Sequence, residues 1–231
     1  MNFLLTNDDG IQAEGIATLI QAVNPLGKCL VVAPAQPQSG CSQRVTVDQP
    51  VLLEQRDANK YAIHGTPADC VRVAIHHFPN DWNFVLSGIN HGGNLGTDIY
   101  YSGTVAAVRE AMLHGFPGIA FSLYRRKHRE FDWKRILPWV QQVFEQILQR
   151  SNGKPVFWNV NFPCLNESDP EPAIIFCPHD SSPLPLNYHS NESHFTYNGD
   201  YHNRQRIANA DVDICFRGNI AVTCFDTNSI I

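Results

Sequence analysis

The chain has 231 residues, and 22 acidic against 17 basic residues give it a formal net charge of −5. This length suits one large α/β domain, or one domain with an appendage, and allows a substantial core. The acidic balance argues against duplex nucleic acid or an anionic membrane as the main partner, because both attract basic surfaces. The first residues lack the basic and apolar regions of a signal peptide, so we expect a cytoplasmic protein.

Short β-rich runs alternate with helical patterns through residues 1–163, which predicts a mostly parallel sheet covered by helices. In chain order, the predicted elements are strand Asn2–Thr6, helix Glu14–Val23, strand Cys29–Ala33, β-structure at Arg44–Glu54 and Tyr61–His64, a helix capped by Thr66 and ending near His77, strand Asn83–Ser87, a helix from Thr104 to His114, strand Gly118–Leu123, a helix within Asp132–Gln149 and strand Val156–Val160. We expect Val156–Val160 to be the last strand of the main sheet.

The remainder of the chain, 164–231, is richer in Pro, Asn, His and Tyr. It contains three β-like runs, Ala173–Cys177, Val212–Phe216 and Asn219–Cys224. We therefore divide the chain into a catalytic core, 1–163, and a β-rich C-terminal extension that packs on the core and on a partner subunit. Seven scattered cysteines form no C-x-x-C pair, so they signal neither a zinc site nor a redox motif.

Three polar loops follow predicted strands, at Asn7–Gly10, Gln38–Gly40 and Ser87–Asn94. If their strands are neighbours, these loops converge at the carboxyl edge of the sheet, where ligands bind in open α/β folds. Convergence would unite two carboxylates, a hydroxyl and an amide oxygen, which suit a hard cation such as Mg²⁺ or Mn²⁺. Asp8 and Asp9 share such an ion only if the chain has already turned, and Gly10 permits that turn.

A second feature is the run Tyr101-Ser102-Gly103-Thr104, which directly precedes a predicted helix. Free backbone N–H groups and the helix dipole make such a start an anion site. Beside a bound cation this anion site would hold a phosphoryl group, so the sequence indicates metal-assisted hydrolysis of a phosphate monoester. Asp8 is compatible with a role as metal ligand, general base or nucleophile.

These residues carry a resemblance to the SurE survival-protein family of metal-dependent nucleotidases. The matching segments are TNDDGI at 6–11, VVAP at 31–34, QSG at 38–40, GTPADCV at 65–71, SGINHGGNLGTDIYYSGTVAA at 87–107 and NVNFP at 159–163. The resemblance implies a Rossmann-like three-layer sandwich that uses one divalent cation, Mg²⁺ or Mn²⁺. It also implies hydrolysis of nucleoside 5′- and 3′-monophosphates by a homodimer or homotetramer that exchanges C-terminal elements.

By motif position, the resemblance also implies site residues. The implied metal ligands are Asp8, Asp9, Ser39 and Asn90. The implied catalytic residues are Asp8, Asn94 and Ser102, and the implied phosphate cradle is Ser102, Gly103 and Thr104. The sequence departs from the family pattern at Cys41, at His91 and through its last third.

Two alternatives stay open. An aspartyl-phosphate phosphatase of the haloacid dehalogenase type needs Asp-x-Asp, whereas Asp8 and Asp9 are adjacent. A non-catalytic nucleotide-binding module on the same fold would bind nucleotide without releasing phosphate. A dinucleotide-dependent dehydrogenase is disfavoured because no G-x-G-x-x-G turn follows the first strand. We expect Asn159 and Asn161 to tie loops together. The aromatic residues Tyr188, Phe195, Tyr197 and Tyr201 either stack on a base or fill a subunit interface, and we favour the interface.

Overall fold

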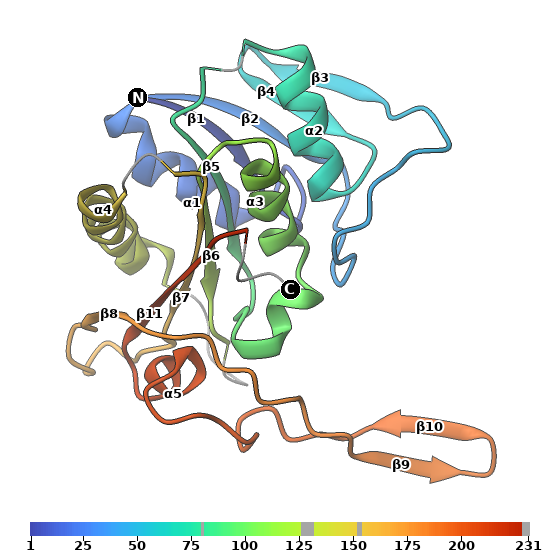
Figure 1. Cartoon of the computed structure of the whole chain (residues 1–231), viewed down its shortest axis with the longest axis vertical. Coiled ribbons are helices and arrows are strands. Elements are labelled where there is room, and N and C mark those ends of the chain that lie inside the picture. Colours follow the sequence, from blue (N-terminus) through green and yellow to red (C-terminus); the bar gives the residue numbers. More distant parts are fainter. Residues whose placement is uncertain (80, 126–131, 152–153, 228–231) are drawn as a thin grey trace.

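The computed structural model describes residues 1–79, 81–125, 132–151 and 154–227 (Figure 1). The strands are β1 (Asn2–Thr6), β2 (Lys28–Pro34), β3 (Leu53–Asp57), β4 (Lys60–Ile63), β5 (Phe84–Asn90), β6 (Gly118–Leu123), β7 (Phe157–Phe162), β8 (Ile174–Phe176), β9 (Tyr188–Asn191), β10 (His194–Tyr197) and β11 (Ile220–Phe225). The helices are α1 (Glu14–Val23), α2 (Pro67–His77), α3 (Gly103–Leu113), α4 (Trp133–Arg150) and α5 (Asp211–Phe216), with 3₁₀ turns η1 (Asn24–Leu26) and η2 (Gly96–Tyr100).

Within the described residues, the main sheet has nine strands in the order β3-β4-β2-β1-β5-β6-β7-β11-β8. The six strands from β4 to β7 are parallel to one another, whereas β3 and β11 run antiparallel to β4 and β7. Helices α1 and α4 cover one face of this sheet, and α2 and α3 cover the other (Figure 1). This confirms the predicted Rossmann-like three-layer α/β fold.

Strand β1 lies at the centre of the sheet and contributes to the core on both faces. Phe3 and Leu5 pack in the cluster beneath α1 and α4, whereas Leu4 packs in the cluster beneath α2 and α3. All three side chains are fully buried because alternate residues of a strand point to opposite faces and both faces are covered. The central position of β1 fixes the direction in which the chain leaves the sheet at Asn7.

Several predicted elements have the bounds expected from the sequence. Strands Asn2–Thr6 and Gly118–Leu123 and helix Glu14–Val23 agree residue for residue. Helix α2 begins after Thr66 as predicted, and its start forms a capping box. The Thr66 hydroxyl oxygen accepts from the Asp69 N–H at 3.2 Å, and the Asp69 carboxylate accepts from the Thr66 N–H at 2.9 Å.

Two predictions about the C-terminal third were wrong. Val212–Phe216 belongs to helix α5 and not to a strand, because acidic residues in its first turn suit the helix start and its apolar side chains pack inward. Strand Val156–Val160, observed as β7, does not end the main sheet, since β11 pairs with it and β8 pairs with β11. These pairings cover an edge that would otherwise be an unpaired apolar strand. The division into 1–163 and 164–231 stays a prediction.

The predicted β-structure at Arg44–Glu54 is mostly irregular, and only its end belongs to β3. The Thr46 N–H donates to the Asp69 carboxylate at 2.8 Å instead of to a neighbouring strand. The Asp69 side chain at the start of α2 therefore accepts a hydrogen bond from a backbone N–H that would pair with a neighbouring strand in a sheet.

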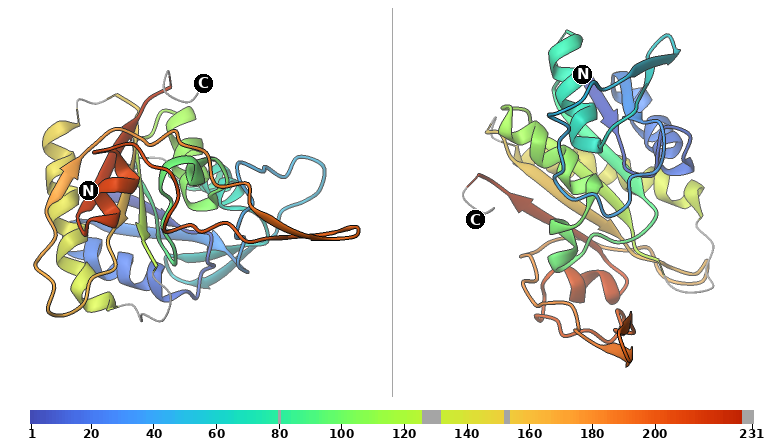
Figure 2. Two further views of the ribbon diagram at one scale, coloured as in Figure 1. Left: turned by 90° about the horizontal axis from the view of Figure 1, so that it is seen from below. Right: turned by 90° about the vertical axis from the view of Figure 1, so that its right-hand side faces the viewer.

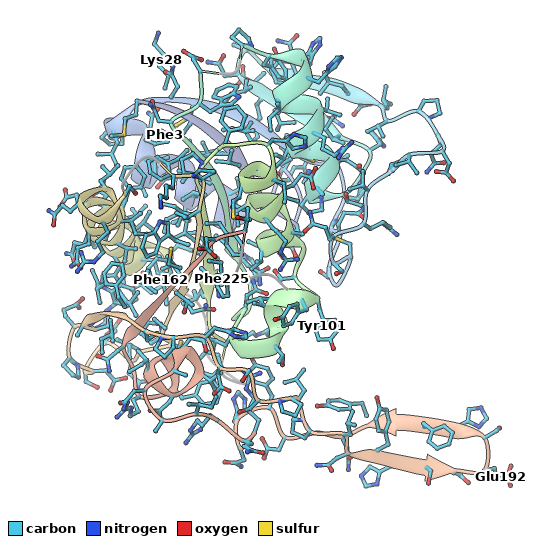
Figure 3. All side chains as sticks on the ribbon, viewed as in Figure 1. Phe3, Lys28, Tyr101, Phe162, Glu192 and Phe225 are labelled. Carbon is cyan, nitrogen blue, oxygen red and sulfur yellow. The ribbon has the colours of Figure 1, made fainter. Side chains whose placement is uncertain are left out.

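The β9–β10 hairpin projects away from the body of the molecule (Figures 1 and 2). Glu192 marks its tip in Figure 3. Tyr188, Phe195 and Tyr197 on this hairpin are exposed. Of the helices in the described ranges, none is both long and apolar enough to cross a membrane.

Candidate active site at the carboxyl edge of the sheet

The three polar loops meet because β2, β1 and β5 are adjacent in the sheet. The Gln38 N–H donates to the Asp8 carbonyl oxygen at 2.7 Å, which joins the loop after β2 to the loop after β1. The His91 N–H donates to the Asp9 carboxylate at 3.1 Å, which joins the loop after β5 to the same segment. Two hydrogen bonds thus connect the loops that the sequence predicted to converge.

The turn after β1 separates the two carboxylates from the regular strand. The Asn7 side-chain amide donates to the Gly10 carbonyl oxygen at 2.8 Å and closes the turn. Gly10 has a φ of 98°, which favours glycine because it lacks a Cβ. Strand β1 therefore ends at Thr6, before Asp8 and Asp9, and both residues lie within the turn, as the sharing of one metal ion requires.

Asp8 is a buried carboxylate that contacts helix α3. The Thr104 hydroxyl donates to its Oδ1 atom at 2.5 Å. Burial raises the pKa of Asp8 to about 6; the Thr104 hydrogen bond opposes this rise, and the charge of Asp9 adds to it. The carboxylate is therefore mainly ionised at neutral pH but lies in an environment that penalises its charge.

The start of α3 lies against Asp8. The Ser102 Oγ atom accepts from the Val105 N–H at 3.1 Å and caps the helix. A Cβ atom added to Gly103 would lie 2.9 Å from both the Asp8 Cβ and the Cys41 Sγ, so only glycine allows this approach. The predicted phosphate cradle, Ser102–Thr104, is consequently adjacent to the predicted metal ligand.

Asn94 is held in place from strand β7. Its carbonyl oxygen accepts from the side chains of Asn159 at 2.7 Å and Asn161 at 3.1 Å. Its N–H donates to Asn161 Oδ1 at 2.8 Å, and its side-chain amide donates to Ser122 Oγ at 2.7 Å. The expectation that Asn159 and Asn161 tie loops together is confirmed, and Ser122 is a contact that sequence reasoning missed.

The two remaining predicted ligands lie in the same loops. Asn90 ends β5, and its side-chain amide donates to the Gly92 carbonyl oxygen at 2.8 Å, so its Oδ1 atom faces away from that bond. Ser39 is exposed and follows Gln38, whose N–H binds the Asp8 carbonyl oxygen. The structure therefore brings the loops of all four predicted metal ligands together, while their binding of a metal stays a prediction.

The residues present fit one divalent cation. Two adjacent carboxylates, one of them buried, concentrate negative charge, and a cation would offset the penalty that raises the pKa of Asp8. The Thr104 hydroxyl donates to Asp8 Oδ1, and the His91 N–H donates to Asp9 Oδ2. The described part of the chain contains no group of three or more His, Cys, Asp or Glu side chains that could together hold a metal ion. The predicted ligand set would offer an ion two carboxylates and two neutral oxygen donors, which suits a hard ion.

The fold and this edge of the sheet define a Rossmann-like α/β protein with paired carboxylates facing a helix start. The sequence pattern of the family described as Survival protein SurE matches residues 3–178. The chain belongs to the SurE family.

Relatives and a solved structure agree with this assignment. The chain is 50% identical over 224 residues to "Putative 5'-nucleotidase alr3139" of Nostoc sp., covering 96% of this chain and 98% of that protein. It is 41% identical over 170 residues to "5'-nucleotidase SurE" of Neisseria gonorrhoeae, covering 73% of this chain and 68% of that protein. The crystal structure of the SurE protein from Aquifex aeolicus matches with a TM-score of 0.86 at 29% identity, covering 98% of this chain and 93% of that chain.

Proposed function

We propose that this protein is a nucleotidase that hydrolyses the phosphate monoester of nucleoside 5′- and 3′-monophosphates. The observation that carries this proposal is the contact between Asp8 and the start of α3, where Thr104 donates to the Asp8 carboxylate at 2.5 Å. This contact supports the proposal because it brings the paired carboxylates beside the helix start that would bind the phosphoryl group. The names of the relatives, which describe 5′-nucleotidases, support the same activity.

Asp8, Asp9, Ser39 and Asn90 would hold one Mg²⁺ or Mn²⁺ ion. When bound, this ion would supply charge stabilisation for the phosphoryl group. The side chains of Asp8 and Asp9 would supply the two negative charges, and Thr104 would keep Asp8 in one orientation through its hydrogen bond. This arrangement requires both carboxylates in their ionised form.

The start of α3 would bind the phosphoryl oxygens. The first N–H groups of a helix have no partner within the helix, so those at Gly103 and Thr104 are suited to an anion. The second N–H of the Asn94 amide, which is not needed for Ser122, would donate to the same group. Asp8 lies beside this cradle and would accept a proton or orient the attacking water there.

The test is phosphate release from a panel of 5′- and 3′-mononucleotides with Mg²⁺, with Mn²⁺ and with EDTA. We expect release only with a metal, and we expect Asp8→Asn and Asp9→Asn each to lose more than about 100-fold in rate while keeping the wild-type melting temperature. Asp57→Asn, at an exposed position at the end of β3, is the matched control. Full activity in EDTA would contradict metal dependence, and near-normal rates in both site variants would contradict the assignment.

We further propose a cytoplasmic homodimer or homotetramer in which residues 164–231 contact a partner subunit. Support comes from the projecting β9–β10 hairpin, whose Tyr188, Phe195 and Tyr197 side chains are exposed in the single chain. Light scattering should give a mass of two or four chains, and Phe195→Asp should lower it. A single-chain mass at micromolar concentration would contradict the proposal.

A further inference from the structure

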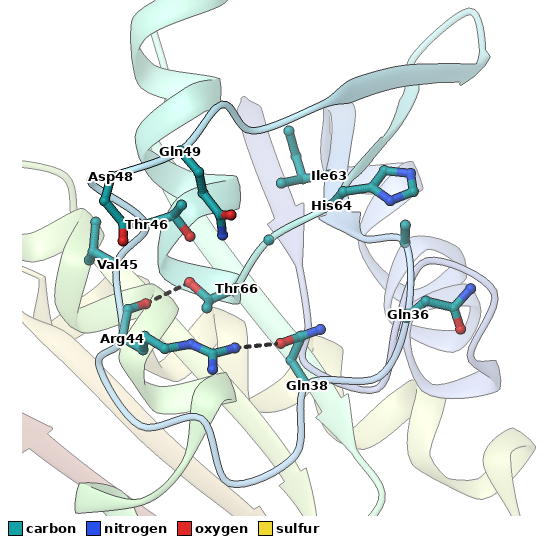
Figure 4. Close-up of a pocket in the computed structure, with 12 residues that line it drawn as sticks. Gln36, Gln38, Arg44, Val45, Thr46, Asp48, Gln49, Ile63, His64 and Thr66 are labelled. Carbon is teal, nitrogen blue, oxygen red and sulfur yellow. Dashed lines mark hydrogen bonds between the residues drawn. The ribbon is translucent and has the colours of Figure 1, made fainter.

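A cavity of about 380 Å³ lies beside the candidate active site (Figure 4). Its walls are the segment after β2, the loop 44–49 and the connection from β4 to α2. Its volume lies in the range of small-molecule sites. Neither the proposed metal ligands nor the phosphate cradle line it.

The cavity is close to Asp8. Gln38 lines the cavity, and its backbone N–H donates to the Asp8 carbonyl oxygen at 2.7 Å. Arg44 also lines the cavity, and its backbone N–H donates to the Cys41 carbonyl oxygen at 3.3 Å. A Cβ atom added to Gly103 would lie 2.9 Å from the Cys41 Sγ, so Cys41 connects Arg44 to the start of α3. A ligand in this cavity would therefore lie next to a phosphoryl group held at Gly103.

Specific hydrogen bonds fix the cavity walls. The Thr66 hydroxyl donates to the Arg44 carbonyl oxygen at 2.6 Å, and the Arg44 guanidinium donates to the Gln38 amide oxygen at 3.0 Å (Figure 4). The N–H and hydroxyl of Thr46 both donate to the Asp69 carboxylate at 2.8 Å. The exposed loop is thus attached to the start of α2 and to the segment after β2.

The chemistry of the lining suits an uncharged polar group. Arg44 and Asp48 are one cation and one anion, so the lining has little net charge, unlike the anion site at α3. Gln49 points into the centre of the cavity in Figure 4, and its amide offers both a donor and an acceptor. His64 also lines the cavity, and its Nε2 atom lies 3.2 Å from the Glu54 carboxylate.

We infer that this cavity binds the nucleoside moiety of the substrate, with Gln49 at the edge of the base and Arg44 stacked on the base or bonded to the ribose. This inference rests on the proposed nucleotidase function. It makes the loop 44–49 the part of the chain that distinguishes a nucleotide from a simple phosphate monoester. The phosphate cradle and the metal ligands would then act in the same way on any phosphate monoester, with or without a base.

The experiment compares 5′-AMP and 5′-GMP with glycerol 2-phosphate, a monoester without a base. Gln49→Trp should fill the cavity, and since Gln49 is exposed the fold should tolerate it. We expect kcat/KM for the nucleotides to fall about 10-fold or more, mainly through KM, with glycerol 2-phosphate changing less than about 2-fold. Arg44→Ala should also lower kcat/KM for the nucleotides more than kcat/KM for glycerol 2-phosphate. Gln149→Trp, at an exposed position of α4 on the opposite face of the sheet, should leave both values unchanged.

Equal losses for nucleotides and glycerol 2-phosphate, or no loss for either, would overturn the inference. Wild-type protein that releases no phosphate from any substrate would instead overturn the proposed function. In that case calorimetric titration with adenosine and guanosine tests separately whether the cavity binds a nucleoside. This measurement needs neither metal nor turnover. Binding to the wild type that Gln49→Trp abolishes would support the inference, and no binding to the wild type would refute it.

Discussion

Gly103→Ala tests whether the close approach of α3 to Asp8 controls activity. The added Cβ would lie 2.9 Å from the Asp8 Cβ and from the Cys41 Sγ, whereas carbon atoms in good contact are about 3.5 Å apart. The helix start and Asp8 must therefore separate by roughly 0.6 Å. A misplacement of about 1 Å can cost 100-fold in rate, so we expect kcat to fall roughly 10-fold.

The effect on stability should be small by comparison. Overpacking costs about 1–3 kcal/mol, while replacing glycine by alanine within a helix returns about 0.5–1 kcal/mol. A net loss of about 1 kcal/mol lowers the melting temperature by about 2–4 °C in a chain of this size. Initial rates of phosphate release and thermal unfolding measure the two effects. A variant with wild-type kcat would refute the reasoning, and Gly103→Ala combined with Cys41→Ala should recover part of the rate because one of the two close contacts is removed.

Three further predictions concern the proposed metal ligand Ser39, the contact of Asn161 with Asn94, and stability in acid. Ser39→Ala should weaken Mn²⁺ affinity about 10-fold or more with an unchanged melting temperature, and an unchanged calorimetric metal titration would remove Ser39 from the ligands. Asn161→Ala removes two hydrogen bonds to Asn94, so it should cost about 1–3 kcal/mol in urea unfolding and also lower kcat; loss of stability alone would leave Asn94 without a catalytic role. Burial raises the pKa of Asp69, but hydrogen bonds from two threonines outweigh this effect and lower the pKa overall. A lowered pKa stabilises the fold above the ordinary carboxyl value and loses that contribution as the pH falls through the folded-state pKa. The unfolding free energy of Asp69→Asn should therefore vary less than that of the wild type below about pH 4, and parallel curves would contradict this.

Local pattern was sufficient to predict the elements of the Rossmann-like core. The apolar run of Asn2–Thr6 is typical of a buried strand, and the spacing of apolar residues in Glu14–Val23 is typical of a helix. Both elements form as predicted. The prediction of β-structure at Val212–Phe216 was wrong because alternating apolar residues over so short a segment match a strand and one helical turn equally well. Its acidic first turn was the signal that could have decided the matter.

Contacts between distant segments were less predictable. The pairing of β11 with β7 joins segments about sixty residues apart, and only the need to cover an apolar edge of the sheet indicates it. The convergence of three loops was predictable because parallel strands share one carboxyl edge. The anchoring of Asn94 by Asn159 and Asn161 was not, since no local pattern tells a buried asparagine which backbone it will bind.

The position of Asp8 at the end of β1 has a consequence for how such proteins diversify. Since β1 is buried on both faces, the proposed catalytic carboxylate is attached to the interior of the sheet, where local opening is least favourable. The loop 44–49 is mostly exposed, and exposed loops vary more readily than the elements they connect. If this loop binds the nucleoside as inferred, its replacement would alter substrate preference and leave Asp8 in place.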